Sequence, residues 1–186
     1  MNKSLILASG SPRRKELLGQ LGYPFTIVVT NVEESQQESE TAQQYVARLS
    51  KDKAMAALTL YPDAVVLGSD TIVVCDEKVL EKPLNLADAK QMLMMLSGRE
   101  HQVMTAVSVV SQEQQETVVV STDVWFKTLS ENEIEQYWQT GEPCDKAGSY
   151  GIQGIGGRFV TRIEGSYHAV VGLPLFETDQ LLQKFL

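Results

Sequence analysis

Short apolar runs and longer amphipathic stretches follow one another along the first third of the chain. The apolar runs at 5–7, 25–29 and 64–67 have the length of strands, and the stretches at 12–21 and 41–60 place apolar residues at helical spacing. The pattern therefore predicts three strands and two helices before residue 70.

The remaining two thirds predict longer elements with clear boundary signals, such as Asn85 as a helix cap and a proline in the first turn of the last helix. The elements expected are a hairpin around residues 76–78, a helix at 86–96, strands at 101–111 and 115–126, a helix from Ser130 to Gly141, a closing hairpin of 159–164 with 167–171, and a final helix from Leu173.

The first helix is preceded by a small polar turn and begins with two arginines. Ser11 suits the N-cap and Pro12 the first helical position, so Arg13 and Arg14 fall in the first turn, where positive side chains oppose the helix dipole. The placement becomes favourable if an anion binds there, held by backbone N–H groups, hydroxyls and guanidinium groups. Two solvated surface arginines are an equally good interpretation of this stretch alone.

Lys53 lies on the apolar stripe of the helix at 41–60, seven residues after Val46 and four after Leu49. A lysine in this position commonly lays its aliphatic chain along the core and exposes its ammonium group to water. The second interpretation is that the ammonium group reaches a site above the core.

Asp70 stands between two strongly apolar runs. Residues 64–67 predict a strand buried on both faces, Gly68 allows close backbone approach, and a further apolar run follows at 72–74. Asp70 is thus expected where the strand leaves the core, and the ends of central strands carry reacting groups in α/β proteins. Aspartate is a common turn former, but this position favours a functional carboxylate.

Residues 145–157 contain five of the 13 glycines. Such a backbone can wrap closely around a ligand, although the spacing matches neither the GxGxxG nor the P-loop pattern. A plain flexible loop is the alternative. His101 is expected to be structural, since no second histidine or cysteine stands at ligand spacing. His168 is expected to be structural because it lies in an apolar strand.

Composition limits the kind of partner and compartment. The net charge is −8 over 186 residues, with 16 basic and 24 acidic side chains, which argues against a nucleic-acid polymer but not against one small anion in a locally basic pocket. Cys75 and Cys144 form no disulfide framework and are expected to be reduced, in a cytoplasmic protein. No stretch resembles a signal peptide or reaches the length of a membrane span, so no membrane partner is expected.

The polar residues singled out form two sets. The donors and cations are Ser9, Ser11, Arg13, Arg14, Lys53, Lys82 and Lys146, and the carboxylates are Glu33, Glu34, Asp70 and Asp145. This mixture suits a polyphosphate bound with a divalent ion, because cations neutralise phosphate charge while carboxylates hold Mg²⁺ or Mn²⁺ and activate water. A serine hydrolase fits less well without a GxSxG elbow, and a zinc hydrolase fits less well with two histidines.

Four segments, 7–14, 68–71, 81–83 and 145–154, resemble the signature segments of the Maf family of nucleoside triphosphate pyrophosphatases. They cover the chain in order and at suitable spacing. The part at 150–154, with the sequence YGIQG, is similar to the branch acting on dTTP and UTP rather than the branch associated with 7-methyl-GTP.

The resemblance implies a single domain over 1–186 with a two-lobed α/β fold, a mixed twisted sheet flanked by helices, and a central cleft. It implies cleavage between the α and β phosphates, to a monophosphate and pyrophosphate. Asp70 matches the proton acceptor, and Asp70 with Glu33 are the expected metal ligands. The positions tied to substrate choice are Arg13, Thr71 and Gln153, and the other polar positions matched are Ser9, Arg14, Glu33, Lys53 and Lys82. The resemblance also suggests a homodimer.

Gln153 offers one acceptor and two donors, and uracil or thymine presents an N3–H donor beside carbonyl acceptors. We therefore expect Gln153 to read the pyrimidine, although an amide that flips could also accept cytosine. Two other functions stay open at this point. One is a nucleotide-binding regulator of septum formation without essential turnover, and the other is removal of modified nucleotides such as 5-methyl-UTP.

Overall fold

The computed structural model describes residues 3–186, and within them seven strands form one mixed sheet. The strands are β1 (Leu5–Leu7), β2 (Phe25–Ile27), β3 (Val65–Cys75), β4 (Lys78–Leu80), β5 (Glu100–Val110), β6 (Gln115–Phe126) and β7 (Val160–Glu164). Their order is β2-β1-β3-β5-β6-β7, with β4 paired to β3. β1 is parallel to both β2 and β3, whereas β4 and β7 are antiparallel to their neighbours.

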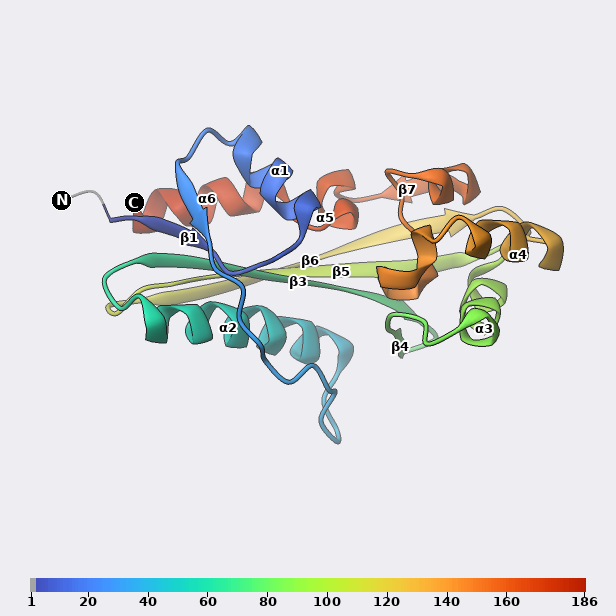
Figure 1. The fold of residues 1–186 in the computed structure, drawn as a ribbon, viewed down its shortest axis with the longest axis horizontal. Coiled ribbons are helices and arrows are strands. Elements are labelled where there is room, and N and C mark those ends of the chain that lie inside the picture. The colour runs from blue at the N-terminus through green and yellow to red at the C-terminus, as the bar shows by residue number, and fades with distance from the viewer. Residues whose placement is uncertain (1–2) are drawn as a thin grey trace. The chain divides into compact units, whose positions relative to one another are not determined.

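Helices occupy most of the connections between these strands. They are α1 (Pro12–Gln20), α2 (Ala42–Leu60), α3 (Leu86–Leu96), α4 (Glu131–Gln139), α5 (Tyr167–Val171) and α6 (Leu175–Phe185), with 3₁₀ turns η1 (Glu142–Asp145), η2 (Ala147–Ser149) and η3 (Ile155–Phe159). The expected α/β class with a mixed sheet is confirmed (Figure 1).

The chain divides into two compact units, where the resemblance implied two lobes. Unit 1 contains the residues up to Asp70, Thr105–Val120 and Gly172–Leu186, and unit 2 contains Thr71–Met104 and Ser121–Val171. β3, β5 and β6 each contribute residues to both units, and the division in β3 falls between Asp70 and Thr71. The single domain expected over 1–186 stays a prediction.

In unit 1, α2 runs along one face of the sheet and α1 and α6 lie on the other (Figure 1). Gly68 of β3 allows α2 to approach closely, because a Cβ atom there would overlap the Ser50 carbonyl oxygen and lie 2.8 Å from the Ala54 backbone nitrogen. The core between α2 and the sheet consists of Ile6, Ala8, Ala54, Ala57, Leu58, Ala64, Val66 and Val110. The close approach expected at Gly68 is therefore confirmed.

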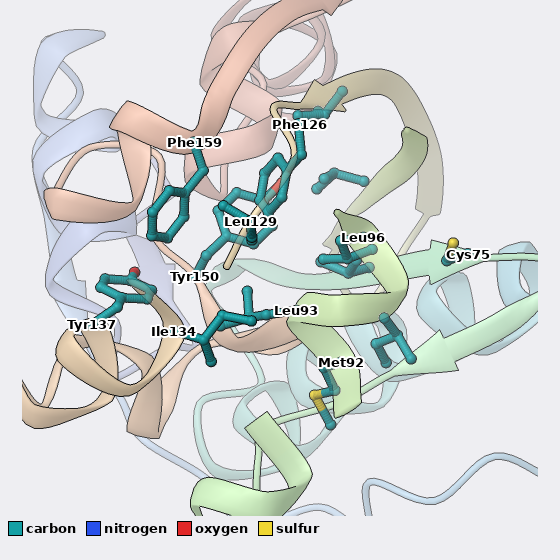
Figure 2. Packing of buried hydrophobic residues seen from close by; sticks show 14 residues of the cluster. Cys75, Met92, Leu93, Leu96, Phe126, Leu129, Ile134, Tyr137, Tyr150 and Phe159 are labelled. Carbon is teal, nitrogen blue, oxygen red and sulfur yellow. The ribbon is translucent and has the colours of Figure 1, made fainter. Parts of the chain in front are cut away.

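Unit 2 has its own apolar cluster, in which α3 and α4 pack with the ends of the strands and with the 3₁₀ turns (Figure 2). Phe126, Phe159, Tyr137 and Tyr150 supply its aromatic rings, with edge-to-face contacts such as Tyr137–Phe159 at 5.0 Å between centroids. His101 is buried, and its Nε2 lies 2.7 Å from the Tyr150 hydroxyl. The structural role expected for His101 is confirmed.

Four of the predicted helix starts are confirmed by their caps, whereas the last helix begins at Leu175, two residues later than expected, with Pro174 at its N-cap. Ser11 accepts from the Arg14 N–H and Asn85 from the Asp88 N–H, and capping boxes open α2 at Thr41 and α4 at Ser130. These side chains satisfy backbone donors that have no partner within the helix. The expected hairpin at 76–78 is also present: Asp76 and Glu77 both have positive φ, as the tight turn between β3 and β4 requires.

Two expectations about local structure are wrong. Asp70 does not end a strand, because β3 continues without a break from Val65 to Cys75. The segment Tyr167–Val171 is the helix α5 rather than a strand, since Ser166 accepts a hydrogen bond from the Ala169 N–H at 3.0 Å and so caps a helical turn. His168 on α5 is consequently exposed rather than held in an apolar strand.

Across residues 3–186, no helix combines the length and the apolar character that a membrane crossing requires.

Candidate active site

Asp70 forms an ion pair with Lys53 inside unit 1. The Lys53 Nζ lies 2.5 Å from Asp70 Oδ1 and 2.8 Å from Glu34 Oε1. The side chains of Lys53 and Asp70 are 15% and 11% exposed, whereas that of Glu34 is 47% exposed. We call Glu34, Lys53 and Asp70 the Lys53 cluster. Because the Lys53–Asp70 pair is largely shielded from water, its charges interact more strongly than those of a surface pair.

The packing of α2 on β3 brings Lys53 to Asp70. Ser50 and Ala54 contact the Gly68 backbone at the distance that only glycine allows, and Lys53 lies on the same stretch of α2. Of the two interpretations of Lys53 drawn from the sequence, the structure supports the second, since the ammonium group ends on a buried carboxylate rather than in water.

Arg14 lies in the same unit and is held by the backbone of the chain just before α6. Its Nε donates to the Gly172 carbonyl at 2.8 Å, and the Ser69 hydroxyl donates to the same carbonyl at 3.2 Å. Burial lowers the pKa of the Arg14 guanidinium below its usual value, while the charges of Asp70 and Glu34 act in the opposite direction and that of Arg13 lowers it further. Arg14 therefore lies within the electrostatic field of the Lys53 cluster.

Ser9 and Ser11 shape the turn that leads into α1. The Ser11 N–H donates to Ser9 Oγ at 3.1 Å, and the Arg14 N–H donates to Ser11 Oγ at 3.3 Å. The turn thus presents the start of α1, with half-buried Arg13 and Arg14 in its first turn. A helix N-terminus that carries two arginines is suited to an anion such as a phosphate group.

The structure distinguishes two adjacent glutamates. Glu33 is exposed and accepts from the Ser35 hydroxyl at 2.9 Å, whereas Glu34 is the residue that contacts Lys53. The sequence named both among the candidate carboxylates, but gave no signal for which of the two would face α2. A loop without periodicity does not reveal the direction of its side chains.

Three of the sequence-predicted site residues, Thr71, Lys82 and Gln153, belong to unit 2. Thr71 is half-buried, and Lys82 and Gln153 are exposed. The segment with Lys82 and the glycine-rich segment are joined, because the Gly148 N–H donates to the Glu81 carbonyl at 3.2 Å.

The glycine-rich segment is not a flexible loop. It contains two 3₁₀ turns, and its backbone N–H groups at Gly151, Ile155 and Gly156 all donate to side chains of unit 2. Gly148 has φ +69 and a Cβ atom there would lie 2.8 Å from the Val73 side chain. The glycines are thus required by close packing, and they present Gln153 on an ordered turn.

The acidic side chains fit a metal ion only in combination with a substrate. Within residues 3–186 there is no group of three or more histidine, cysteine or acidic side chains arranged to hold one. Mg²⁺ is commonly bound by one or two carboxylates together with substrate phosphates and water. Asp70 and Glu34, which share Lys53, match that limited donor set.

Comparison with known proteins relates these features to a family. A dTTP/UTP pyrophosphatase of Vibrio parahaemolyticus is 74% identical over 98% of this chain and 97% of its own, and one of Vibrio cholerae is 70% identical over 97% of both. Among solved structures, the Staphylococcus aureus Ham1 protein aligns with a TM-score of 0.47 at 13% identity, covering 67% of this chain and 72% of that chain. The family model described as Maf-like protein matches residues 4–185, so the chain belongs to the Maf family.

Proposed function

We propose that this protein is a nucleoside triphosphate pyrophosphatase that hydrolyses dTTP and UTP to the monophosphate and pyrophosphate. The relatives that share about seven residues in ten with it carry that activity in their names. The single structural observation that supports the chemistry is the shielded ion pair between Lys53 and Asp70, in the same unit as the two arginines at the start of α1.

Asp70 is the candidate general base. Its carboxylate is 2.5 Å from the Lys53 ammonium group, which holds it in place. In this role Asp70 accepts a proton from the water that attacks the α-phosphorus, in line with the departing pyrophosphate.

Arg13, Arg14, Lys53 and Lys82 are the candidate partners of the phosphate oxygens. Phosphoryl transfer depends mainly on positioning and on charge stabilisation, so cations fixed before the substrate arrives are suited to it. Ser9 supports this arrangement by fixing the turn before α1. Thr71 and Gln153, with Arg13, are proposed to select the substrate, and Gln153 is proposed to read the pyrimidine edge.

A divalent ion, Mg²⁺ or Mn²⁺, is proposed to bind together with the triphosphate, through Asp70 and one of the two adjacent glutamates. The sequence favoured Glu33, and the contact of Glu34 with Lys53 makes Glu34 the stronger candidate. Such an ion would neutralise phosphate charge and so assist departure of pyrophosphate.

The deciding experiment is a release assay with dTTP, UTP, 5-methyl-UTP, dCTP and dATP, each titrated with Mg²⁺ and Mn²⁺ and repeated with a chelator. We expect pyrophosphate from dTTP and UTP, lost on chelation, and the ratios of kcat/KM will show whether a modified pyrimidine is preferred. Binding of these nucleotides without release of pyrophosphate would contradict the proposal and favour the regulator of cell division instead.

Asp70→Asn tests the assigned base. The amide has the same shape but cannot take the proton, so we expect kcat to fall by at least about a hundredfold while the protein still folds. Near-normal turnover by this variant would contradict the role given to Asp70.

Residence in the cytoplasm and a homodimeric state stay predictions. Cell fractionation tests the first, and light scattering on the purified protein tests the second.

A further inference from the structure

Two side chains that have no role in the proposed reaction form hydrogen bonds with the backbone of the turn that contains Gln153. Glu142 accepts hydrogen bonds from the Ile155 N–H at 2.8 Å through Oε1 and from the Gly156 N–H at 2.9 Å through Oε2. Tyr137 donates its hydroxyl to Glu142 Oε2 and accepts from the Gly151 N–H at 3.1 Å. We call these two side chains and the three backbone groups the Glu142 cluster.

The hydrogen bonds of the Glu142 cluster stand on both sides of Gln153. Gly151 lies two residues before it, and Ile155 and Gly156 lie two and three residues after it. Tyr150, one residue earlier, is fixed in addition by His101. The Gln153 side chain itself is exposed. The chain is therefore held immediately before and after an otherwise open side chain.

The glycines of this turn leave room for the Glu142 and Tyr137 side chains. A Cβ atom at Gly154 would lie 2.6 Å from the Glu142 carboxyl carbon, and one at Gly156 would lie 2.5 Å from the Tyr137 hydroxyl oxygen. Both distances are too short for real atoms, so the carboxylate and the hydroxyl occupy the space that side chains at 154 and 156 would need. Glycine here serves contact with the protein's own residues.

Burial and charge strengthen the hydrogen bonds of the Glu142 cluster. Tyr137 is fully buried, its ring packs edge-to-face on Phe159, and burial together with the Glu142 carboxylate raises the pKa of its hydroxyl (Figure 2). Burial would raise the pKa of Glu142, but the hydrogen bonds from Tyr137, Gly156 and Ile155 and the charge of Lys146 bring it below its usual value. A charged acceptor bound to backbone donors makes stronger hydrogen bonds than a neutral one.

We propose that Glu142 and Tyr137 are positioning residues for base recognition, which fix the backbone on both sides of Gln153 so that its amide meets the pyrimidine in one orientation. This inference rests on the proposed function, in which Gln153 reads the base. It predicts that the two side chains control the choice between nucleotides, although neither is among the residues proposed to bind the substrate.

The test is the ratio of kcat/KM for dTTP to kcat/KM for dATP. A role confined to stability changes the amount of active enzyme, which cancels in this ratio, whereas a role in positioning changes the ratio itself. Glu142→Gln replaces an acceptor by a group that presents N–H donors to Ile155 or Gly156, and we expect the ratio to fall about tenfold, with KM for dTTP rising more than kcat falls.

Tyr137→Phe is the second variant, and it keeps the ring packing on Phe159. It removes the partner of the Gly151 N–H, so the ratio should fall in the same direction by about threefold. If Glu142→Gln does not fold, this variant decides the question alone. The matched control is Glu135→Gln on α4, where the carboxylate pairs with the Lys90 side chain and contacts no backbone donor of the turn; its ratio should equal that of the wild type.

A double variant shows whether the effect passes through Gln153. In a Gln153→Ala background, Glu142→Gln should change the ratio no further, because the group that it positions is absent. An unchanged ratio in both Glu142→Gln and Tyr137→Phe would overturn the inference, as would an additive loss in the double variant.

Failure of this inference is distinguishable from failure of the proposed function. No pyrophosphate from dTTP with the wild-type protein would refute the function. A normal wild type with an unchanged ratio in Gln153→Ala would refute base reading by Gln153. A ratio that falls in Gln153→Ala but not in the Glu142 and Tyr137 variants would refute only the positioning role.

Discussion

The Lys53 cluster of unit 1 and the Glu142 cluster of unit 2 differ in what their charged groups bind. In the Lys53 cluster, one ammonium group lies between two carboxylates, and one of these, Glu34, is half exposed. In the Glu142 cluster, one carboxylate is surrounded by a buried hydroxyl and backbone N–H groups. In the first cluster the charged side chains bind one another, whereas in the second the carboxylate binds the main chain.

The difference matches the two proposed roles, which are binding of the phosphate groups for the first cluster and positioning of the base-reading residue for the second. Phosphate groups are common to all nucleotides, so the cations that bind them need not distinguish one nucleotide from another. Distinguishing bases depends on a hydrogen-bonding group held in one orientation. Four substitutions test the packing and the contacts on which this difference depends.

Gly68→Ala should destabilise the protein most. The new methyl group would overlap the Ser50 carbonyl and lie 2.8 Å from the Ala54 nitrogen, so backbone must move, and we expect a loss of about 3 kcal/mol in the free energy of unfolding. Urea denaturation measures it. Gly19→Ala is the matched control: it lies on α1 with open space around it, and should stabilise by about 0.5 kcal/mol. Equal stability of the two variants would contradict the close approach of α2 to β3.

Lys53→Met should act mainly on turnover. It removes the cation next to Asp70 and keeps much of the side-chain volume, so we expect kcat to fall about a hundredfold, or about 2.7 kcal/mol in activation free energy. Steady-state kinetics with dTTP measures the effect. Lys51→Met, on the same helix but exposed, is the control and should behave as the wild type. Comparable losses in the two variants would show that helix charge, and not the contact with Asp70, matters.

His101→Gln should change the response of unit 2 to acid. Burial, with a smaller contribution from the Arg99 charge, lowers the pKa of His101 to about 4, from 6.5 in the unfolded chain. Between these values the unfolded chain binds more protons, so stability falls as the pH drops from about 6.5 to about 4, by about 2 kcal/mol between pH 7 and pH 5. Urea denaturation at a series of pH values should show a shallower slope for the variant; identical slopes would contradict a buried neutral imidazole.

Gly154→Ala should have the smallest effect on stability. Its methyl group would meet the Glu142 carboxylate, which is the end of a side chain and can rotate away, but rotation gives up its backbone hydrogen bonds, so we expect a loss of about 2 kcal/mol, less than for Gly68→Ala. The dTTP to dATP ratio should nevertheless fall, since the rotated carboxylate loses its backbone donors. Thermal unfolding and the substrate ratio should therefore separate this variant from Gly68→Ala, and a variant with full selectivity would argue that the Glu142 cluster is not needed.

Local signals in the sequence were sufficient for most elements of the fold. Caps such as Ser11, Thr41 and Ser130 act over one helical turn, so the start of a helix can be predicted from residues close together in the sequence. The same reasoning failed at α5, where apolar residues suggested a strand although Ser166 supplies a helix cap. It also placed Asp70 at a strand end, whereas Asp70 lies within β3. A single carboxylate in an apolar run does not interrupt a strand when a lysine from another element pairs with it, as Lys53 does here.

The candidate site was predictable in its residue types but not in its contacts. Lys53 was conspicuous because a charge on an apolar stripe needs an explanation, and its partner Asp70 was conspicuous for the same reason. Whether Glu33 or Glu34 contacts Lys53 depends on the path of an irregular loop, and the spacing of residues in the sequence does not predict that path. The role of Glu142 could not be predicted either, because its partners are backbone N–H groups, which every residue other than proline has.

The interleaving of the two units has a consequence for how the protein is made. Unit 1 combines three stretches separated along the chain, the last being Gly172–Leu186, while unit 2 is assembled from the stretches between them. During synthesis, β1 and α2 therefore leave the ribosome long before α6, which completes their unit. Unit 1 cannot finish folding until α6 has left the ribosome, and a nascent chain stalled before α6 is made should be readily digested by protease.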